Sequence, residues 1–189
     1  MLVELLDFSI QPGSRGYEVA GRDPWAITYR RRGARVVDLI ADGRLPAPPE
    51  RVQAVLVDYG RHQQFVRGVA ESRVLWKGVG QLLVYQRLGL PLLSDRDYTL
   101  AVSWGRRGGA LFVRFDCANP RGPAQRRGIV RLYTHSGGWI LQPTSGGTLA
   151  RYQVLLDLAG SLPGWLARSG TSREIPSLFA SVAKQARGW

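Results

Sequence analysis

Alternating apolar and polar positions dominate the chain between residues 69 and 158. The alternating stretches are rich in β-branched and aromatic side chains and lie at 69–79, 81–90, 96–104, 110–116, 126–134, 139–142 and 148–158. Glycine-rich segments separate them, for example at 105–109 and 145–147. Closely spaced strands with short turns are typical of an antiparallel meander. Together with two earlier stretches, 25–30 and 34–45, the pattern predicts about nine strands.

Helical spacing of apolar residues marks the regions outside this meander. Leu2, Leu5 and Leu6 precede Gly13, so we expect residues 1–24 to form an N-terminal helical segment packed on the domain. The prolines at 46–49 break the second strand, and a helix is expected to follow over 49–58 with a further turn at 62–66.

The C-terminal region also has helical spacing. Its apolar stripe consists of Ile175, Leu178, Phe179, Val182, Ala183 and Ala186. Because proline is tolerated in a first helical turn, Pro176 places the start of this helix near residue 175. Residues 165–168 are then expected to form a separate preceding turn.

The order of elements predicts an α+β helix-grip fold. A long antiparallel sheet curls, and one amphipathic C-terminal helix must pack on it, most naturally on the concave face. Short helices follow the second strand. Such a layout leaves an internal cavity wherever side chains do not fill the space. We expect a single domain over residues 25–189.

Charge changes the range of partners that the fold can have. The chain has 26 Lys and Arg against 14 Asp and Glu, a net charge of +12. This balance favours anionic partners such as a membrane surface, although a merely solvated arginine-rich face would have the same composition. The strands lack the paired aromatic platform of RNA-binding sheets, so we expect no nucleic-acid partner.

Residue types that carry covalent or metal chemistry are sparse. Cys117 is the single cysteine, and the two histidines, His62 and His135, lie in no ligand cluster. No nucleophile elbow, phosphate loop or dinucleotide fingerprint occurs. We therefore expect no cofactor, no metal and a non-enzymatic protein, and a monomer.

The apolar runs and the N-terminal residues indicate where in the cell the protein is expected. None reaches the ~18 residues that span a bilayer. The first ten residues include Glu4 and Asp7 and do not begin with the positively charged segment that a signal peptide has. We expect a cytoplasmic protein that is peripheral to the membrane, and export by a signal already removed stays an alternative.

Several motifs in register resemble START domains, the steroidogenic acute regulatory protein-related lipid transfer family. The motifs are the Ser-Asp-Arg-Asp-Tyr corner at 94–98, Gly-Ile-Val-Arg at 128–131, Gly-Trp at 138–139, and the Asp-x-x-Gly-x-Leu-Pro segment at 157–163. The resemblance covers about residues 25–187. It implies a bacterial single-domain member that holds one lipid in a tunnel, without covalent chemistry.

The resemblance also implies where the lid and the membrane-docking edge lie. They are the last helix and the turn at 105–109, where Arg106 and Arg107 suit anionic headgroups. One position departs from the sterol-binding members. They have a basic residue six positions after the motif arginine, where this chain has Val102. A sterol is therefore disfavoured, and a phospholipid, a fatty acyl chain, or a carotenoid-like or other polyprenyl ligand stays open.

The expected cavity wall combines apolar side chains with aromatic residues that have a polar tip. Arg96 has two interpretations: it pairs with Asp97 to close a strand corner, or it enters the tunnel and holds a headgroup. Neighbouring strand residues point to opposite faces, so Arg96 and Asp97 are not expected to enter together. The predicted lining residues are Tyr85, Arg96, Val102, Phe115, Arg131, Trp139, Gln142, Tyr152, Trp165, Leu178, Phe179 and Val182.

An enzymatic alternative uses the same cavity. Polyketide aromatase/cyclases of the helix-grip superfamily fold a poly-ketone with Arg, Tyr and Trp side chains and promote its dehydration. This chain has such residues, and Tyr85 and Arg131 are the candidates for that role.

Overall fold

A ten-stranded sheet forms most of the molecule in the computed structural model, which describes residues 4–33, 36–159 and 164–188, and the side chains of 164–173 are not described. The strands are β1 (Tyr17–Arg22), β2 (Ile27–Arg31), β3 (Val37–Leu45), β4 (Val69–Gly78), β5 (Gln81–Leu88), β6 (Arg96–Arg107), β7 (Ala110–Cys117), β8 (Val130–Arg131), β9 (His135–Thr144) and β10 (Gly147–Leu156). Their order is β1-β2-β3-β10-β9-β7-β6-β5-β4, and the short β8 pairs in parallel with β6.

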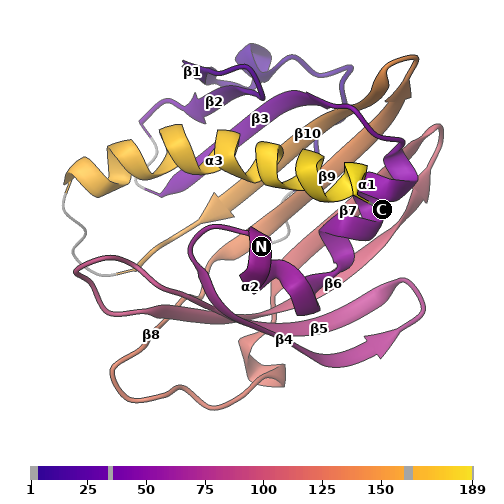
Figure 1. The fold of residues 1–189 in the computed structure, drawn as a ribbon. Helices are drawn as coiled ribbons and strands as arrows, with labels where there is room; N and C mark the ends of the chain where they lie inside the picture. Colours follow the sequence, from indigo (N-terminus) through magenta and orange to yellow (C-terminus); the bar gives the residue numbers. More distant parts are fainter. Residues whose placement is uncertain (1–3, 34–35, 160–163, 189) are drawn as a thin grey trace.

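The helices lie against one face of this sheet. They are α1 (Pro49–Val57), α2 (His62–Phe65) and α3 (Gly164–Arg187). Short 3-10 turns lie in the connections between elements, at Pro12–Arg15, Tyr59–Arg61 and Asn119–Arg121. Figure 1 shows α3 lying across the concave side of the curved sheet, with α1 beside its C-terminal half. This confirms the helix-grip arrangement that the alternation pattern predicted. None of the described helices combines the length and the apolar character that crossing a bilayer requires.

The core lies between the sheet and α3. Phe179, Val182, Ala183 and Ala186 of α3 are fully buried there. Gly43 of β3 allows this close packing, because a Cβ at that position would lie 2.7 Å from the Phe179 ring. The contacts of α3 with the sheet therefore identify which face of each strand is the concave one.

The N-terminal segment differs from its prediction. Residues 4–10 contain no helix, and β1 follows the turn at Pro12–Arg15. The reason is that β10 binds the backbone of this segment. Gln153 accepts from the Leu6 amide (3.1 Å) and donates to the Glu4 carbonyl (3.0 Å), while Arg151 donates to the carbonyls of Asp7 and Ile10.

Two other elements also differ. Residues 164–187 form one continuous helix with Pro176 in its interior, so the predicted separate turn at 165–168 is wrong. The predicted strand at 126–134 shrinks to β8, whose two residues pair with Arg96 and Asp97. The alternation there reflects a loop anchored by buried side chains instead of a full ladder.

Candidate ligand-binding site

A row of aromatic side chains on the sheet faces α3. The register sets Tyr152 of β10 opposite Trp139 of β9, and Trp139 opposite Val113 of β7. The Trp139 ring lies 4.7 Å from Tyr152 and 5.0 Å from Phe179 of α3, between ring centroids. These contacts identify the concave face, and alternation along each strand then assigns its neighbours.

The next row on the same face is apolar. Phe115 lies opposite Val102, and Val102 lies opposite Leu82. All three side chains are buried. A basic side chain at position 102 would point into this apolar interior, so Val102 keeps the centre of the concave face uncharged.

Tyr152 is the member of the aromatic row that keeps some exposed surface. Its strand runs between β3 and β9 in the middle of the sheet, yet its side chain is only partly buried. Burial raises the pKa of its hydroxyl well above 10. The hydroxyl is therefore a neutral hydrogen-bonding group in an otherwise apolar wall.

A second part of the concave face is polar and uncharged. The Tyr98 hydroxyl donates to Gln86 Oε1 (3.0 Å), and Gln86 Nε2 donates to Ser72 Oγ (2.9 Å). The Ser72 hydroxyl in turn donates to the Tyr59 carbonyl (2.6 Å), and the Gln86 amide also meets His62 Nδ1 (3.3 Å). This chain of bonds connects β4, β5 and β6 to the turn that precedes α2.

His135 belongs to the same interior. Its ring packs edge-on against Tyr98 (4.3 Å between centroids) and against Phe115 (5.2 Å). Burial lowers its pKa to about 4, and its Nδ1 has no hydrogen-bond partner in the described part of the chain. The ring is therefore neutral at physiological pH.

Arg96 lies at the end of the concave face where α3 begins. It is buried, and its guanidinium donates to the carbonyls of Ser94 and Leu158. It forms no ion pair with Asp97, whose side chain points to the other face. Arg96 thus ties the strand corner to the segment that leads into α3.

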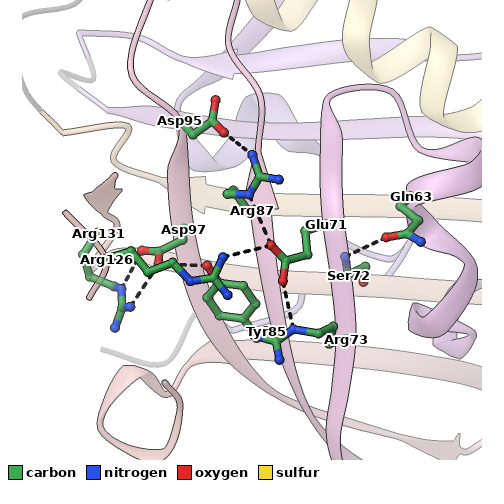
Figure 2. A network of polar contacts seen from close by, with 10 residues as sticks. All are labelled: Gln63, Glu71, Ser72, Arg73, Tyr85, Arg87, Asp95, Asp97, Arg126 and Arg131. Atoms are coloured by element: carbon green, nitrogen blue, oxygen red, sulfur yellow. Dashed lines mark hydrogen bonds and ion pairs between the residues drawn. The ribbon is translucent and has the colours of Figure 1, made fainter. Parts of the chain in front are cut away.

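Tyr85 and Arg131 lie on the convex face, so the prediction that they line the cavity is wrong. Arg131 forms a two-pronged ion pair with Asp97, at 2.6 Å and 3.0 Å, and the Tyr85 hydroxyl donates to Asp97 at 3.1 Å. Figure 2 shows this cluster from close by. The cause is alternation: Val84 and Gln86 face the interior, so Tyr85 between them faces outward.

Arginines surround this outward cluster. Glu71 meets Arg73 (2.9 Å), Arg87 (3.3 Å) and Arg126 (3.3 Å), as Figure 2 shows. Burial disfavours the ionised form of Glu71, but its bonds from Arg87 and Arg126 outweigh this and lower its pKa. Arg73 and Arg126 also stack over the Tyr85 ring, at 5.0 Å and 5.4 Å.

The remaining predicted residues fall into three groups. Gln142 lies on the convex side, in an outer pocket of about 440 Å³ that Phe8, Arg107 and Pro143 also line, so its assignment to the interior is wrong. Leu178 and Val182 pack against the core with Phe179. The Trp165 side chain lies outside the described residues.

The two arginines predicted to dock on membranes are at the end of β6. Arg106 is exposed and forms an ion pair with Glu50 of α1 (3.0 Å). Arg107 is exposed beside the outer pocket. β6 runs to Arg107, so the turn itself is shorter than residues 105–109. Within the described residues, no cluster of three or more His, Cys, Asp or Glu side chains could hold a metal.

Sequence reasoning missed the polar part of the interior. Gln86, Tyr98 and His135 were not among the predicted lining residues. The available signal was spacing: Tyr98 and Val102 are four apart on one strand and must share a face. The contact between Trp139 and Phe179 of α3 then shows that this shared face is the concave one.

Comparisons with known proteins agree with this geometry. Residues 45–182 match the family described as "Polyketide cyclase / dehydrase and lipid transport". An uncharacterised protein of Pseudomonas aeruginosa is 27% identical over 120 residues, which are 62% of this chain and 59% of that protein. The chain thus spans less than two thirds of this relative.

Solved structures with the same fold include both lipid-transfer proteins and cyclases. The STAR-related lipid transfer protein of Xanthomonas axonopodis matches with a TM-score of 0.82 and 26% identity, over 91% of this chain and 99% of that one. Human STARD10 matches with 0.79 and 17%, over 100% and 82%. The Zhui aromatase/cyclase of a Streptomyces species matches with 0.56 and 13%, over 79% and 93%. The chain belongs to the polyketide cyclase/dehydrase and lipid transport family, and its fold is that of the STAR-related lipid transfer domains.

Proposed function

We propose that this protein binds a lipid between the concave face of the sheet and α3, and transfers it between membranes without catalysis. The observation that carries the proposal is Tyr152, which keeps some exposed surface although its ring packs beside the buried Trp139 and Phe115 of the concave face. A long apolar molecule beneath α3 would cover that surface. The Tyr152 hydroxyl and the polar chain at Tyr98 would orient its polar end.

The wall also supports a ligand class. Val102 leaves the middle of the interior without charge, which favours an acyl or polyprenyl chain over a sterol held by an ion pair. Arg96 lies at the end of the interior where a headgroup would emerge. A phospholipid or a fatty acyl chain fits this division into an apolar middle and a cationic end.

Native mass spectrometry of the purified protein, followed by organic extraction, tests the proposal. We expect a bound lipid of one main class. Val102→Phe should reduce the bound lipid, because the added ring would project into the interior from the concave face. Ser103→Phe is the matched control, because Ser103 is the next residue on β6 and points to the opposite face.

The result that would overturn the proposal is protein free of lipid after gentle purification that also takes up none from vesicles. Equal loss of lipid in the two phenylalanine variants, with native circular dichroism in both, would show that the interior is not the binding site.

A second candidate function is cyclisation of a poly-ketone. The family description includes polyketide cyclases, and the interior holds Tyr98, Tyr152 and His135, which can exchange protons with a bound carbonyl compound. Turnover of a poly-ketone mimic that is lost in Tyr152→Phe would favour this function. Tyr85 and Arg131 are excluded from that role, because both lie on the convex face.

A further inference from the structure

Exposed apolar side chains gather at one hairpin. In the described part of the chain, the large apolar residues with high exposure are Val19, Val74, Leu75, Trp76, Val79, Leu92 and Tyr133. Four of the seven lie within residues 74–79, which include the end of β4 and its turn into β5. Trp76 is 49% exposed and Val79 is completely exposed. The ladder pairs Val74 with Val84 and Trp76 with Leu83, so Val74 and Trp76 lie on opposite faces of this edge of the sheet. We call the exposed apolar residues of the edge, Val74, Leu75, Trp76 and Val79, the tip patch.

The Trp76 ring is held in place at this tip. Its six-membered ring lies over Gly78, where a Cβ would come within 2.4 Å of the indole. Gly78 therefore leaves room for the six-membered ring of Trp76 against the turn. A half-exposed tryptophan packed in this way offers an apolar surface to a partner.

The tip patch shares its end of the sheet with basic residues. Lys77 lies within it, and Arg73 precedes it on β4. The Trp104 amide donates to the Gly80 carbonyl (3.0 Å), so the turn lies beside β6 a few residues before Arg106 and Arg107. Figure 1 shows both hairpins reaching the same end of the molecule.

The form of the edge argues against a second strand as the partner. β4 is the last strand of the sheet, but its ladder with β5 shifts register between Val69 and Glu71 and between Val74 and Trp76. Bulges and basic side chains on an edge oppose strand addition. Tryptophan with a rim of arginine and lysine instead matches the headgroup region of an anionic bilayer.

We propose that the tip patch is the surface by which this protein docks on anionic membranes, with Trp76 and Val79 inserted at the headgroup level. The inference deepens the proposed function, because it adds the surface by which a lipid carrier would reach a bilayer, and this surface lies at the end of β6 opposite to Arg96. It differs from the expectation drawn from the sequence, in which the last helix and the turn at 105–109, with Arg106 and Arg107, form the lid and the docking edge. Here these arginines are the basic rim of an apolar contact.

Co-sedimentation with phosphatidylcholine vesicles, with and without phosphatidylglycerol, tests the docking surface. We expect binding to the anionic vesicles that salt weakens. The double variant Trp76→Ser with Val79→Ser should lower the partition coefficient by about tenfold or more, because it removes the inserted apolar surface. Lys77→Gln should lower it about fivefold.

The matched control removes exposed apolar surface elsewhere, as Val19→Ser with Tyr133→Ser, and should bind vesicles like the unmodified protein. Brominated phosphatidylcholine in the anionic vesicles should quench part of the intrinsic fluorescence. In Trp76→Phe, which keeps an apolar ring, that quenching should shrink while binding persists.

Three results would overturn the docking inference. They are unchanged vesicle binding in the double variant, an equal loss of vesicle binding in the control, and a dimer in solution that dissociates into monomers in Trp76→Ser. Lipid content separates this failure from that of the proposed function. If the double variant loses vesicle binding but keeps its extracted lipid, both proposals stand. If neither protein contains lipid, the proposed function fails whatever the vesicles show.

Discussion

The Asp97–Arg131 pair shows how a motif can identify a fold without forming its binding site. Asp97 is completely buried and Arg131 nearly so, and both carboxylate oxygens of Asp97 accept from Arg131. Arg131 also donates to the Pro123 carbonyl (3.1 Å), so the pair anchors the loop that leads into β8. Its contribution is to the stability of the convex side.

Arg131→Met should therefore destabilise the fold by about 3–5 kcal/mol, because it leaves the Asp97 carboxylate buried without its counter-ion. Arg126→Met is the control. Arg126 is about half exposed, and its loss should cost under about 1 kcal/mol. Urea unfolding at neutral pH measures both, and similar losses in the two variants would contradict the assignment. Bound lipid per folded protein should not change in either.

His135 gives the stability a dependence on pH. Burial lowers its pKa to about 4 in the folded protein, whereas an unfolded histidine titrates near pH 6.5. Between these values the unfolded chain binds the additional proton. Stability therefore falls as the pH falls through this window, by up to ~1.4 kcal/mol per pH unit from this group.

His135→Phe should remove that component while keeping the edge contacts with Tyr98 and Phe115. The difference in unfolding free energy between neutral and mildly acidic buffer should be smaller in the variant than in the unmodified protein. Identical pH profiles of the two proteins would show that folding leaves the titration of His135 unchanged, and would contradict the lowered pKa.

Among the elements, α3 combines firm and weak contacts. Its C-terminal half buries Phe179, Val182 and Ala183 against the sheet. Pro176 lies in the middle of the helix, where it has no amide to donate to the Ser172 carbonyl and its ring crowds that turn. The weak point thus separates the half that closes the core from the half that begins at Gly164.

Pro176→Ala should stabilise the protein by roughly 1–3 kcal/mol, because it restores the helical bond and removes the crowding. Amide hydrogen exchange over residues 164–175 should slow, and exchange of bound lipid with vesicles should slow with it. Ser177→Ala is the control at the neighbouring helical position. Faster exchange in Pro176→Ala would refute the role of the proline as a weak point.

The strands were predictable because their period of two survives in the sequence, as at β6 and β10. The faces of β5 were not. Leu82 to Tyr85 form an unbroken apolar run, and such a run does not reveal which side chains meet the core when both faces are covered. The N-terminal helix failed for another reason: distant side chains, Arg151 and Gln153, bind the backbone there and override local spacing.

At the scale of the whole molecule, the fold is a curved sheet closed by one helix, and the lipid that we propose to bind between them should contribute to the stability of the protein. A ligand held at about a hundred times its dissociation constant adds about 2.7 kcal/mol. For a chain of this size, removal of the lipid should lower Tm by about 5–10 °C. Calorimetry before and after delipidation measures the change, and re-addition of the extracted lipid should reverse it. An unchanged Tm would place the lipid outside the folded interior.

The cluster around Glu71 has a consequence for how the protein behaves towards polyanions. One carboxylate serves Arg73, Arg87 and Arg126 on the convex face. Among the ion pairs of the described residues, loss of Glu71 would leave Arg73 and Arg126 without a carboxylate partner, while Arg87 would keep Asp95. Glu71→Gln should therefore strengthen the binding of this surface to polyanions. The variant should elute from a heparin column at a higher salt concentration than the unmodified protein. The Glu71 carboxylate thus weakens the binding of polyanions to this face of a chain with a net charge of +12.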